Sequence, residues 1–391
     1  MEYRKLPHGE ERISTIGLGM GNIYLSPDDV VEETLFYAVD HGINLYDMCC
    51  GRMKVYELFG DAVAGRRDKV YTQMHFGAVY EDENYGRSRK LELVKRSFDK
   101  MLNAVKTDYT DFGYIHCIDE ENEFEEIMNN GTWDYVCSLK EQGVVRHLGF
   151  STHTPAMAHR FLQTGMVDIC MFSLNPAYDY GLGELGNGRM GERARLYQEA
   201  ERLGVGITVM KPFAGGQLLN GKQSPLNMTL TRFQCIQYAL DRPGVLCCLP
   251  GGGCVQDIKD VLAFYEADES RKDYSVLGKA VPAKAMGRCV YCNHCAPCPG
   301  GIDIGLVNKF YDLARIGDEF ARDHYNKLSV HADACVQCGH CERHCPFHVK
   351  QMSRMKSIKE YFTYLIERQI NDSSHKKGAI VNFCLPAYEK R

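Results

Sequence analysis

Short apolar segments with a strand-like composition recur eight times in roughly the first 250 residues, separated by segments with helical spacing. The helical pattern is clearest over residues 91–105, where apolar side chains three and four residues apart fall on one face. Eight such alternations favour a (β/α)8 barrel over an open doubly wound sheet. The predicted strands cover residues 13–21, 43–49, 70–76, 112–117, 147–152, 169–174, 206–212 and 245–251.

Polar side chains occur at the carboxyl ends of several predicted strands. In a (β/α)8 barrel these ends meet at one mouth, where the active site is built. We therefore expect a shared site to which separate strands contribute, and which binds a small-molecule substrate. The candidates are Asp47, His75, His116, Ser151, Asn175 and Lys211.

Two glycine-rich turns follow the seventh and eighth predicted strands. Residues 211–217 read KPFAGGQ, and residues 250–254 read PGGGC before a predicted helix. Glycine lets backbone N–H groups approach an anion closely, and loops at these places in a barrel commonly bind phosphate. Simple turn formation is the alternative. The pattern favours a phosphate-bearing ligand held by Gly215, Gly251, Gly252 and Gly253.

Eight of the 18 cysteines form two groups nearer the carboxyl end. Each group reads C-x2-C-x2-C and adds a fourth cysteine directly before a proline, as [4Fe–4S] ligands do. The fourth cysteine of such a run commonly binds the other cluster, whereas zinc sites use two CxxC pairs with a longer spacer. We therefore predict two [4Fe–4S] clusters. Their ligands are Cys289, Cys292, Cys295 and Cys345 for one, and Cys335, Cys338, Cys341 and Cys298 for the other.

A polar stretch near residue 270 separates the barrel signals from the cysteine groups. The sequence therefore predicts a barrel over residues 1–270 and a small helical, ferredoxin-like domain with a helical tail over residues 271–391. Between the cysteine groups, apolar residues from Ile304 to Ala314 predict a helix with one buried face.

Charge and hydropathy exclude some partners. The chain has 46 basic and 51 acidic side chains and a formal net charge of -5, so a nucleic-acid partner is not expected. No apolar run approaches the roughly 18 residues of a membrane-spanning helix, and the first residues lack the apolar stretch of a secretion signal. We expect a cytoplasmic protein, because cysteines in that reducing compartment tend to hold metals rather than form disulfides.

A family resemblance is carried by segments that read HGINLYD, RRDKVYTQ, KTDYTDFGYIH, GVVRHLGFSTH, KPFAGGQLLNGK and CVYCNHCAPCPGGIDI. The barrel segments resemble aldo-keto reductases, and the chain resembles the ferredoxin-fused, iron–sulfur branch of that family. The resemblance implies a barrel that reduces carbonyl groups with a nicotinamide cofactor, using an Asp–Tyr–Lys–His tetrad. Asp47 and His116 match the Asp and the His of that tetrad.

The other two tetrad positions differ from the family. The family Tyr lies five residues after the Asp, where this chain has Arg52, and the family Lys aligns with His75. In the family the Tyr protonates the carbonyl oxygen and the Lys lowers its pKa, so the usual acid is absent here. Thr152 and Met171 replace a cofactor-binding Asn and Gln. Asp257 replaces an Arg that pairs with the 2′-phosphate of NADPH, and its carboxylate would repel that phosphate.

These departures favour an iron–sulfur oxidoreductase that reduces a small organic substrate with electrons passed through the two clusters. His75, His116 or Arg52 would supply protons or stabilise negative charge on the substrate, and Asp47 would orient them. Histidine is suited to supplying protons because it titrates near neutral pH. The electrons would come from a ferredoxin- or flavodoxin-type donor rather than from tightly bound NADPH. A flavin in the phosphate site is an alternative.

Two other functions are compatible with the same residues. One is NAD(P)H-dependent carbonyl reduction, with His75 or Tyr56 replacing the missing acid and Tyr80 as a further candidate. The other is a barrel without catalysis that carries electrons or senses the redox state of a partner. Turnover of any substrate would exclude the non-catalytic alternative, and a nicotinamide requirement would separate the two enzymes.

Overall fold

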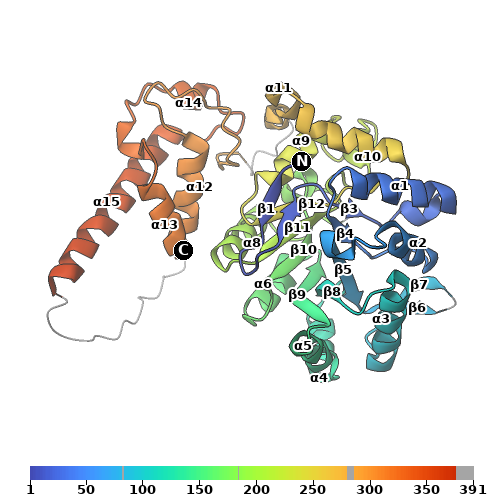
Figure 1. Cartoon of the computed structure of the whole chain (residues 1–391). Helices are drawn as coiled ribbons and strands as arrows, with labels where there is room; N and C mark the ends of the chain where they lie inside the picture. The colour runs from blue at the N-terminus through green and yellow to red at the C-terminus, as the bar shows by residue number, and fades with distance from the viewer. Residues whose placement is uncertain (82, 184, 280–285, 376–391) are drawn as a thin grey trace.

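Eight parallel strands form the curled sheet that the sequence predicts (Figure 1). In the computed structural model, which describes all residues except 82, 184, 280–285 and 376–391, neighbouring strands follow the order β12-β11-β10-β9-β8-β5-β4-β3. The N–H groups of Gly17 and Gly19 donate to the carbonyls of Cys248 and Pro250 and so join the first strand to the last. The strands are β3 (Leu18–Gly19), β4 (Leu45–Asp47), β5 (Tyr71–Phe76), β8 (Thr110–Ile115), β9 (Val145–Thr152), β10 (Ile169–Ser173), β11 (Gly206–Met210) and β12 (Val245–Cys248).

Helices cover the outside of the barrel because each presents an apolar stripe to the strands. In α3 (Leu91–Val105) the buried side chains Val94, Phe98 and Met101 form the stripe predicted from the sequence. One hydrophobic cluster runs from these helices to the strands. The other barrel helices are α1 (Asp28–Asp40), α2 (Lys54–Ala62), α4 (Glu121–Asn129), α5 (Thr132–Glu141), α6 (Pro155–Leu162), α7 (Pro176–Asp179), α8 (Met190–Arg202), α9 (Arg232–Leu240) and α10 (Val255–Leu262).

Two antiparallel hairpins interrupt the alternation of strands and helices. β1 (Tyr3–Lys5) pairs with β2 (Arg12–Ser14), so the predicted first strand is divided between β2 and the barrel strand β3. β6 (Ala78–Glu81) pairs with β7 (Asn84–Arg87) directly after β5. This second hairpin was not predicted, because its strands are too short to give a clear periodic signal. It lies at the carboxyl end of β5, next to the mouth of the barrel.

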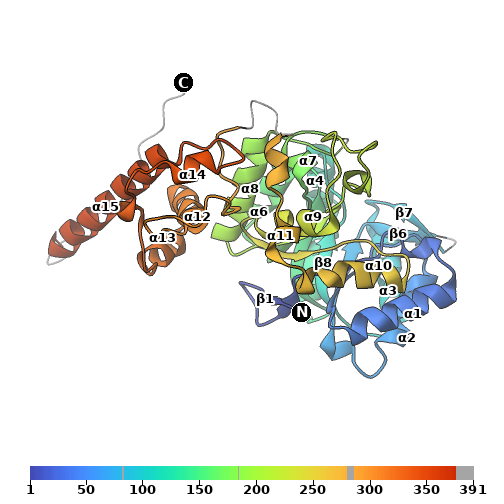
Figure 2. The ribbon, with the colours of Figure 1, turned by 90° about the horizontal axis from the view of Figure 1, so that it is seen from above.

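The residues after the barrel form helices with a hydrophobic cluster of their own (Figure 2). The predicted amphipathic helix is present as α12 (Ile304–Arg315), which buries Ile304, Val307, Tyr311 and Ala314. Both views place it beside α8 of the barrel, and residues of the two helices are in contact. The group also contains α13 (Glu319–Asn326), α14 (His340–Arg343) and α15 (Gln351–His375).

The predicted domain boundary near residue 270 stays a prediction. α11 (Glu269–Lys272) lies at this point of the chain. The final segment from residue 376, including Cys384, lies outside the described residues. Within the described part, no helix is long and apolar enough to cross a membrane.

Candidate functional site

Four side chains form a continuous hydrogen-bonded chain at the barrel mouth. Asp47 Oδ1 lies 2.7 Å from His75 Nε2, and His75 Nδ1 lies 3.0 Å from His116 Nδ1. The chain ends at the Tyr85 hydroxyl, 2.7 Å from His116 Nε2. Asp47, His75 and His116 are buried, whereas Tyr85 is 42% exposed, so the chain runs from the barrel interior to the surface. The structure thus brings three of the predicted site residues together and adds a fourth.

The direction of these hydrogen bonds follows from the carboxylate. Ionised Asp47 only accepts hydrogen bonds, so His75 carries a proton on Nε2 and donates it. A neutral His75 then accepts at Nδ1, which makes His116 the donor there and leaves its Nε2 to accept from Tyr85. Burial and the neighbouring His75 hold the pKa of His116 well below its usual range, in agreement with a neutral ring.

Tyr85 reaches the mouth because the β6–β7 hairpin pairs with the loop after β4. The Tyr85 N–H donates to the Gly51 carbonyl and the Met53 N–H donates to the Glu83 carbonyl, each at 3.1 Å. In the family pattern that loop would supply the tyrosine itself. The sequence pattern does not single out Tyr85, since the only signal is a tyrosine in the turn-rich segment EDENYGR after the third barrel strand. Burial raises the pKa of Tyr85 above its usual value.

Arg52 and Tyr56, both predicted as catalytic candidates, are held elsewhere. All three nitrogens of the Arg52 guanidinium are engaged, by the carbonyls of Tyr24 and Ser26 and by the carboxylate of Asp28 2.6 Å away. Arg52 therefore fixes the loop before α1. We remove it from the catalytic set.

Tyr56 lies on α2 inside the hydrophobic core. Its hydroxyl is 3.1 Å from that of Tyr80, which in turn donates to the Cys50 carbonyl. Burial raises the pKa of both tyrosines. Neither hydroxyl bonds to the chain that ends at Tyr85, so we remove Tyr56 and Tyr80 as well.

Two further mouth candidates hold the backbone. The buried Ser151 hydroxyl accepts from the Cys117 N–H at 2.8 Å. Asn175 caps α7 and also donates to the Lys211 carbonyl at 2.9 Å.

The ammonium of Lys211 is exposed and has no ion-pair or hydrogen-bond partner within the described residues. Burial raises the pKa of the Cys49 thiol, and the positive charge of Lys211 partly offsets this rise. Lys211 therefore places a positive charge near Cys49 at the mouth.

An acidic side chain already occupies the predicted phosphate site. Asp257 Oδ2, in the first turn of α10, accepts from the Gly253 N–H at 2.9 Å. A carboxylate at a helix N-terminus uses the same favourable field that a phosphate would. Gly251 and Gly215 are exposed, and Gly252 is packed against Ile258. These glycines therefore form turns around an acidic position, which disfavours a further anion at α10.

The eight motif cysteines line two separate pockets. We call them the inner cysteine pocket, with Cys289, Cys292, Cys295 and Cys345, and the outer cysteine pocket, with Cys298, Cys335, Cys338 and Cys341. Each pocket thus takes three thiols from one motif and the fourth from the other, the grouping expected for crossed ligation. Their volumes are 260 and 320 Å3, counted with the parts open to solvent.

The chemistry of the inner cysteine pocket fits an iron–sulfur cluster. Burial raises the pKa of Cys289 to about 11 and that of Cys292 to about 12, so thiolates gathered here require compensating positive charge. The Gln351 amide and the Val349 N–H point at the sulfurs of Cys289 and Cys345. Such hydrogen bonds to ligand sulfurs tune bound clusters.

The inner cysteine pocket packs against the barrel. Cys289, Cys292 and Cys345 contact the barrel's hydrophobic cluster, whereas three of the four outer cysteines contact the C-terminal cluster. The barrel residue Arg242 donates to the carbonyl of Val290, between the first two inner ligands. Cys338, at the outer pocket, is exposed. The two pockets therefore lie at increasing distance from the barrel.

A partly buried histidine–carboxylate pair lies beside His116. His153 Nδ1 is 2.9 Å from Asp119 Oδ2, and Cys117 completes a group whose potential ligand atoms lie within 4.8 Å. Asp119 Oδ1 also accepts from the Thr152 hydroxyl and the His153 N–H. Burial opposes protonation of His153, but the bond to Asp119 prevails and raises its pKa to about 9. Both carboxylate oxygens thus have hydrogen-bond partners, so we interpret this group as an ion pair rather than a metal site.

Comparisons with known proteins agree with the fold. Residues 15–234 match the model of the Aldo/keto reductase family. An uncharacterized oxidoreductase, YqkF of Bacillus subtilis, is 28% identical over 180 residues, which is 44% of this chain and 57% of that protein. The chain thus spans little more than half the length of this relative. The chloroplastic pyridoxal reductase of Arabidopsis thaliana is 23% identical over 353 residues, 84% of this chain and 86% of that protein.

Two solved structures share the fold. The aldo-keto reductase AKR11C1 from Bacillus halodurans has a TM-score of 0.58 and 18% identity, covering 72% of this chain and 97% of its own. A putative aldo-keto reductase from Pseudomonas aeruginosa has a TM-score of 0.52 and 22% identity, covering 67% of this chain and 94% of its own. The strand order, the buried Asp47 and His116 at the mouth and the family match over more than half of the residues lead to one conclusion: this chain belongs to the aldo/keto reductase family.

Proposed function

We propose that this family member is an iron–sulfur oxidoreductase that reduces a small organic substrate at the barrel mouth. The observation that carries the proposal is the division of eight motif cysteines into two pockets with exchanged fourth ligands. When bound there, [4Fe–4S] clusters would supply single electrons. The ligands are the inner and outer sets predicted from the sequence.

The arrangement of the two pockets supports electron delivery toward the mouth. The exposed Cys338 and Val336 put the outer cysteine pocket at the surface, where an external ferredoxin- or flavodoxin-type donor can dock. On the barrel side, Tyr180 follows α7 and lines the same cavity as the inner ligand Cys289. α7 begins directly after Asn175 at the mouth, so one short helix lies between the mouth and that cavity.

The chain from Asp47 to Tyr85 supports protonation of the reduced substrate. With neutral rings, Tyr85 points its proton at His116. A proton taken up from solvent at the Tyr85 oxygen shifts the chain by one step, because the Tyr85 proton moves to His116 Nε2 and the His116 proton moves from Nδ1 to His75 Nδ1. Asp47 stabilises the resulting imidazolium on His75, and Tyr85 holds the new proton toward the mouth. Transfer of that proton to the substrate returns the two other protons along the chain and restores the neutral rings. In this mechanism His75, held by Asp47, takes the place of the family Lys, and Tyr85 takes the place of the family Tyr.

The test is anaerobic purification followed by iron and sulfide analysis and reduction with dithionite. We expect about eight iron and eight sulfide atoms per chain, the content of two [4Fe–4S] clusters, and visible absorbance that bleaches on reduction. Stoichiometric zinc, or no metal after anaerobic reconstitution, would overturn the proposal. A matched Cys137→Ala variant, in which a cysteine outside the pockets is lost, should retain the full iron content.

A second candidate function is nicotinamide-dependent reduction of an aldehyde. It is favoured by the Tyr85 hydroxyl next to His116 and by the pyridoxal reductase among the relatives. Because Asp257 occupies the helix N-terminus of α10, the coenzyme would be NADH rather than NADPH. NADH oxidation that depends on an added aldehyde, in protein stripped of iron, would favour this candidate. Strict dependence of turnover on iron would favour the first.

A further inference from the structure

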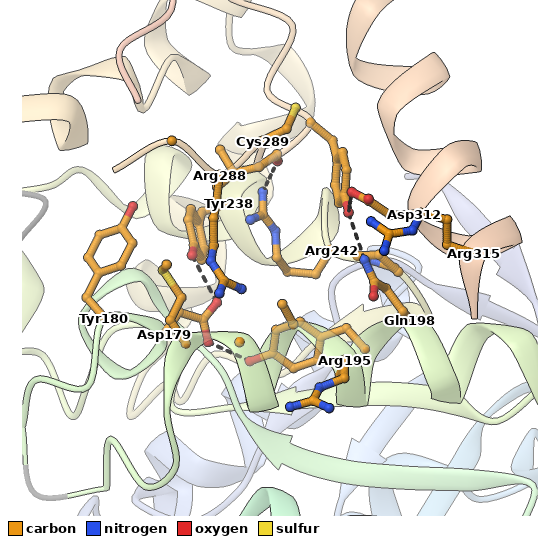
Figure 3. Close-up of a pocket in the computed structure, with 18 of the residues that line it drawn as sticks. Asp179, Tyr180, Arg195, Gln198, Tyr238, Arg242, Arg288, Cys289, Asp312 and Arg315 are labelled. Carbon is orange, nitrogen blue, oxygen red and sulfur yellow. Dashed lines mark hydrogen bonds between the residues drawn. The ribbon is translucent and has the colours of Figure 1, made fainter. Parts of the chain in front are cut away.

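A large cavity lies between the barrel and the cysteine-bearing segment (Figure 3). Its walls come from α8, the end of α9, residues 287–291 and α12, and its volume is about 1240 Å3 with the part open to solvent. No residue of the Asp47–Tyr85 chain lines it, so it is separate from the barrel mouth. Cys289 lines both this cavity and the inner cysteine pocket.

The cavity has a positive charge excess. Five arginines line it, and its two carboxylates, Asp179 and Asp312, are already paired with Arg193 and Arg354. Three of the arginines have neither an ion-pair nor a hydrogen-bond partner within the described part of the chain, and these are Arg195, Arg288 and Arg315. They belong to α8, to the cysteine-bearing segment and to α12, so they converge from three elements on one space. An anion bound there would be attracted from three sides.

Two buried polar atoms at this cavity lack partners. Arg242 is 6% exposed, and its Nε has no hydrogen-bond acceptor among the residues that the structure describes. Tyr180 is 5% exposed, and its hydroxyl has no hydrogen-bond partner among them either. Buried polar groups are nearly always satisfied, so each such atom calls for an explanation. Both residues line the cavity, but neighbouring atoms close these two polar atoms off from solvent. The exposed arginines therefore carry the argument for an anion.

The tyrosine rings along the walls of the cavity indicate that the ligand also carries a flat ring. Tyr180, Tyr238 and Tyr291 line the cavity, and the Arg242 guanidinium lies over the Tyr238 ring at 4.3 Å. Figure 3 shows Tyr238 and Arg242 side by side between α8 and the segment that carries Cys289. Tyrosine rings and guanidinium planes stack on planar aromatic groups. A molecule with a flat ring and a phosphate matches both halves of this lining.

We propose that this cavity binds an aromatic phosphate ester, of the type of flavin mononucleotide or an adenine nucleotide. The unpaired arginines bind the phosphate, and the tyrosine rings contact the flat ring. Binding rests on the cavity alone. Any effect of the ligand on the inner cysteine pocket, through Cys289, rests on the function proposed above.

Titration calorimetry on the full-length, cluster-loaded protein under anaerobic conditions tests the proposal. The probes are flavin mononucleotide, adenosine monophosphate, riboflavin and inorganic phosphate. We expect one of the two phosphate esters to bind at one molecule per chain, and riboflavin or phosphate alone to bind at least tenfold more weakly. The ester that binds more tightly identifies the ring. The proposal would be overturned if neither ester binds. It would also be overturned if riboflavin binds as tightly as flavin mononucleotide and adenosine monophosphate does not bind, because the phosphate would then contribute nothing.

Variants locate the site. Arg288→Gln and Arg315→Gln each remove one exposed, unpaired guanidinium and should weaken binding about tenfold, the size expected for a charged hydrogen bond. Arg202→Gln, on the same helix as Arg195 but outside the lining, is the matched control and should bind normally. Unchanged affinity in both cavity variants would overturn the assignment. Iron analysis of the same samples distinguishes the two proposals. If the protein binds the ester but contains no iron, only the iron–sulfur function is contradicted.

Discussion

The hydroxyl of Tyr85 lies 2.7 Å from Nε2 of His116, although 31 positions separate the two residues in the sequence. The tyrosine comes from a hairpin after β5, whereas the family pattern places an acid in the loop after β4. The hairpin pairs with that loop through backbone hydrogen bonds at Gly51 and Met53. In the proposed mechanism the acidic hydroxyl therefore comes from a different segment, while the histidine at the end of β8 is the one that the family pattern places there.

Replacing Tyr85 with Phe should lower kcat by about 100-fold or more, because a general acid typically contributes that much. Substrate affinity should change little, since the ring remains. The clusters should be unaffected, because Tyr85 lies at the mouth and lines neither cysteine pocket. Steady-state kinetics with the physiological or a surrogate electron donor measure kcat and KM separately.

Tyr80→Phe is the matched control in the same hairpin. Tyr80 faces Tyr85 across the two strands, but its hydroxyl bonds Tyr56 and the Cys50 carbonyl in the core. Its loss should reduce stability by about 1 kcal/mol and leave kcat within a fewfold of wild type. The opposite pattern, an inactive Tyr80→Phe and an active Tyr85→Phe, would remove Tyr85 from the mechanism.

The sequence predicted the mouth only where strand ends determine it. Asp47, His75 and His116 each lie at or next to the carboxyl end of a barrel strand, so the fold alone brings them together. Tyr85 depends on pairing between a short hairpin and a loop about thirty residues away, which leaves no periodic signal. Arg52 and Tyr56 were chosen from sequence position, which does not show where a side chain points. Their side chains turn to the α1 loop and to the core.

The cysteine groups were predictable for a different reason. Spacing within one motif fixes three neighbouring thiols, and the proline after the fourth directs it elsewhere. The exchange of Cys298 and Cys345 between the pockets follows that rule. The cavity beside Cys289 left no such trace, because its arginines come from segments that meet only when the helices pack on the barrel.

Asp47→Asn should lower kcat by about 100-fold or more while the fold is kept. An Asn side chain can donate to His75 and thereby favours the wrong ring tautomer, which would break the ordered chain to Tyr85. A kcat equal to wild type would show that the Asp47–His75 pair is not part of the proton path.

Crossed ligation predicts which cysteine variants resemble each other. Cys298→Ala should give the same electron paramagnetic resonance spectrum as Cys338→Ala, because both line the outer cysteine pocket. Cys345→Ala should match Cys292→Ala, at the inner pocket. Iron content should fall toward half in each variant. If Cys298→Ala instead matches Cys292→Ala, each motif binds its own cluster and the crossed assignment is wrong.

Asp257 predicts a coenzyme preference if nicotinamide binds at the mouth. Its carboxylate at the start of α10 should repel the 2′-phosphate, so NADH should bind at least tenfold more tightly than NADPH. Asp257→Ser should reduce this preference, and Asp260→Ser, one turn further along the same helix, should not. Equal binding of both coenzymes by the wild type would contradict the prediction.

The His153–Asp119 pair predicts that stability falls in mildly alkaline solution. The pKa of His153 is about 9 in the folded protein and about 6.5 in an unfolded chain, so its contribution is complete below pH 6.5 and is lost as the pH rises through 9. The pKa of Asp119 is lowered, so its carboxylate remains ionised over this whole interval. His153→Gln should therefore cost on the order of 2 kcal/mol at pH 6 and much less at pH 9.5. Urea unfolding followed by the fluorescence of Trp133, the single tryptophan, measures both differences, and a gap that is constant with pH would show that His153 is not charged in the folded protein.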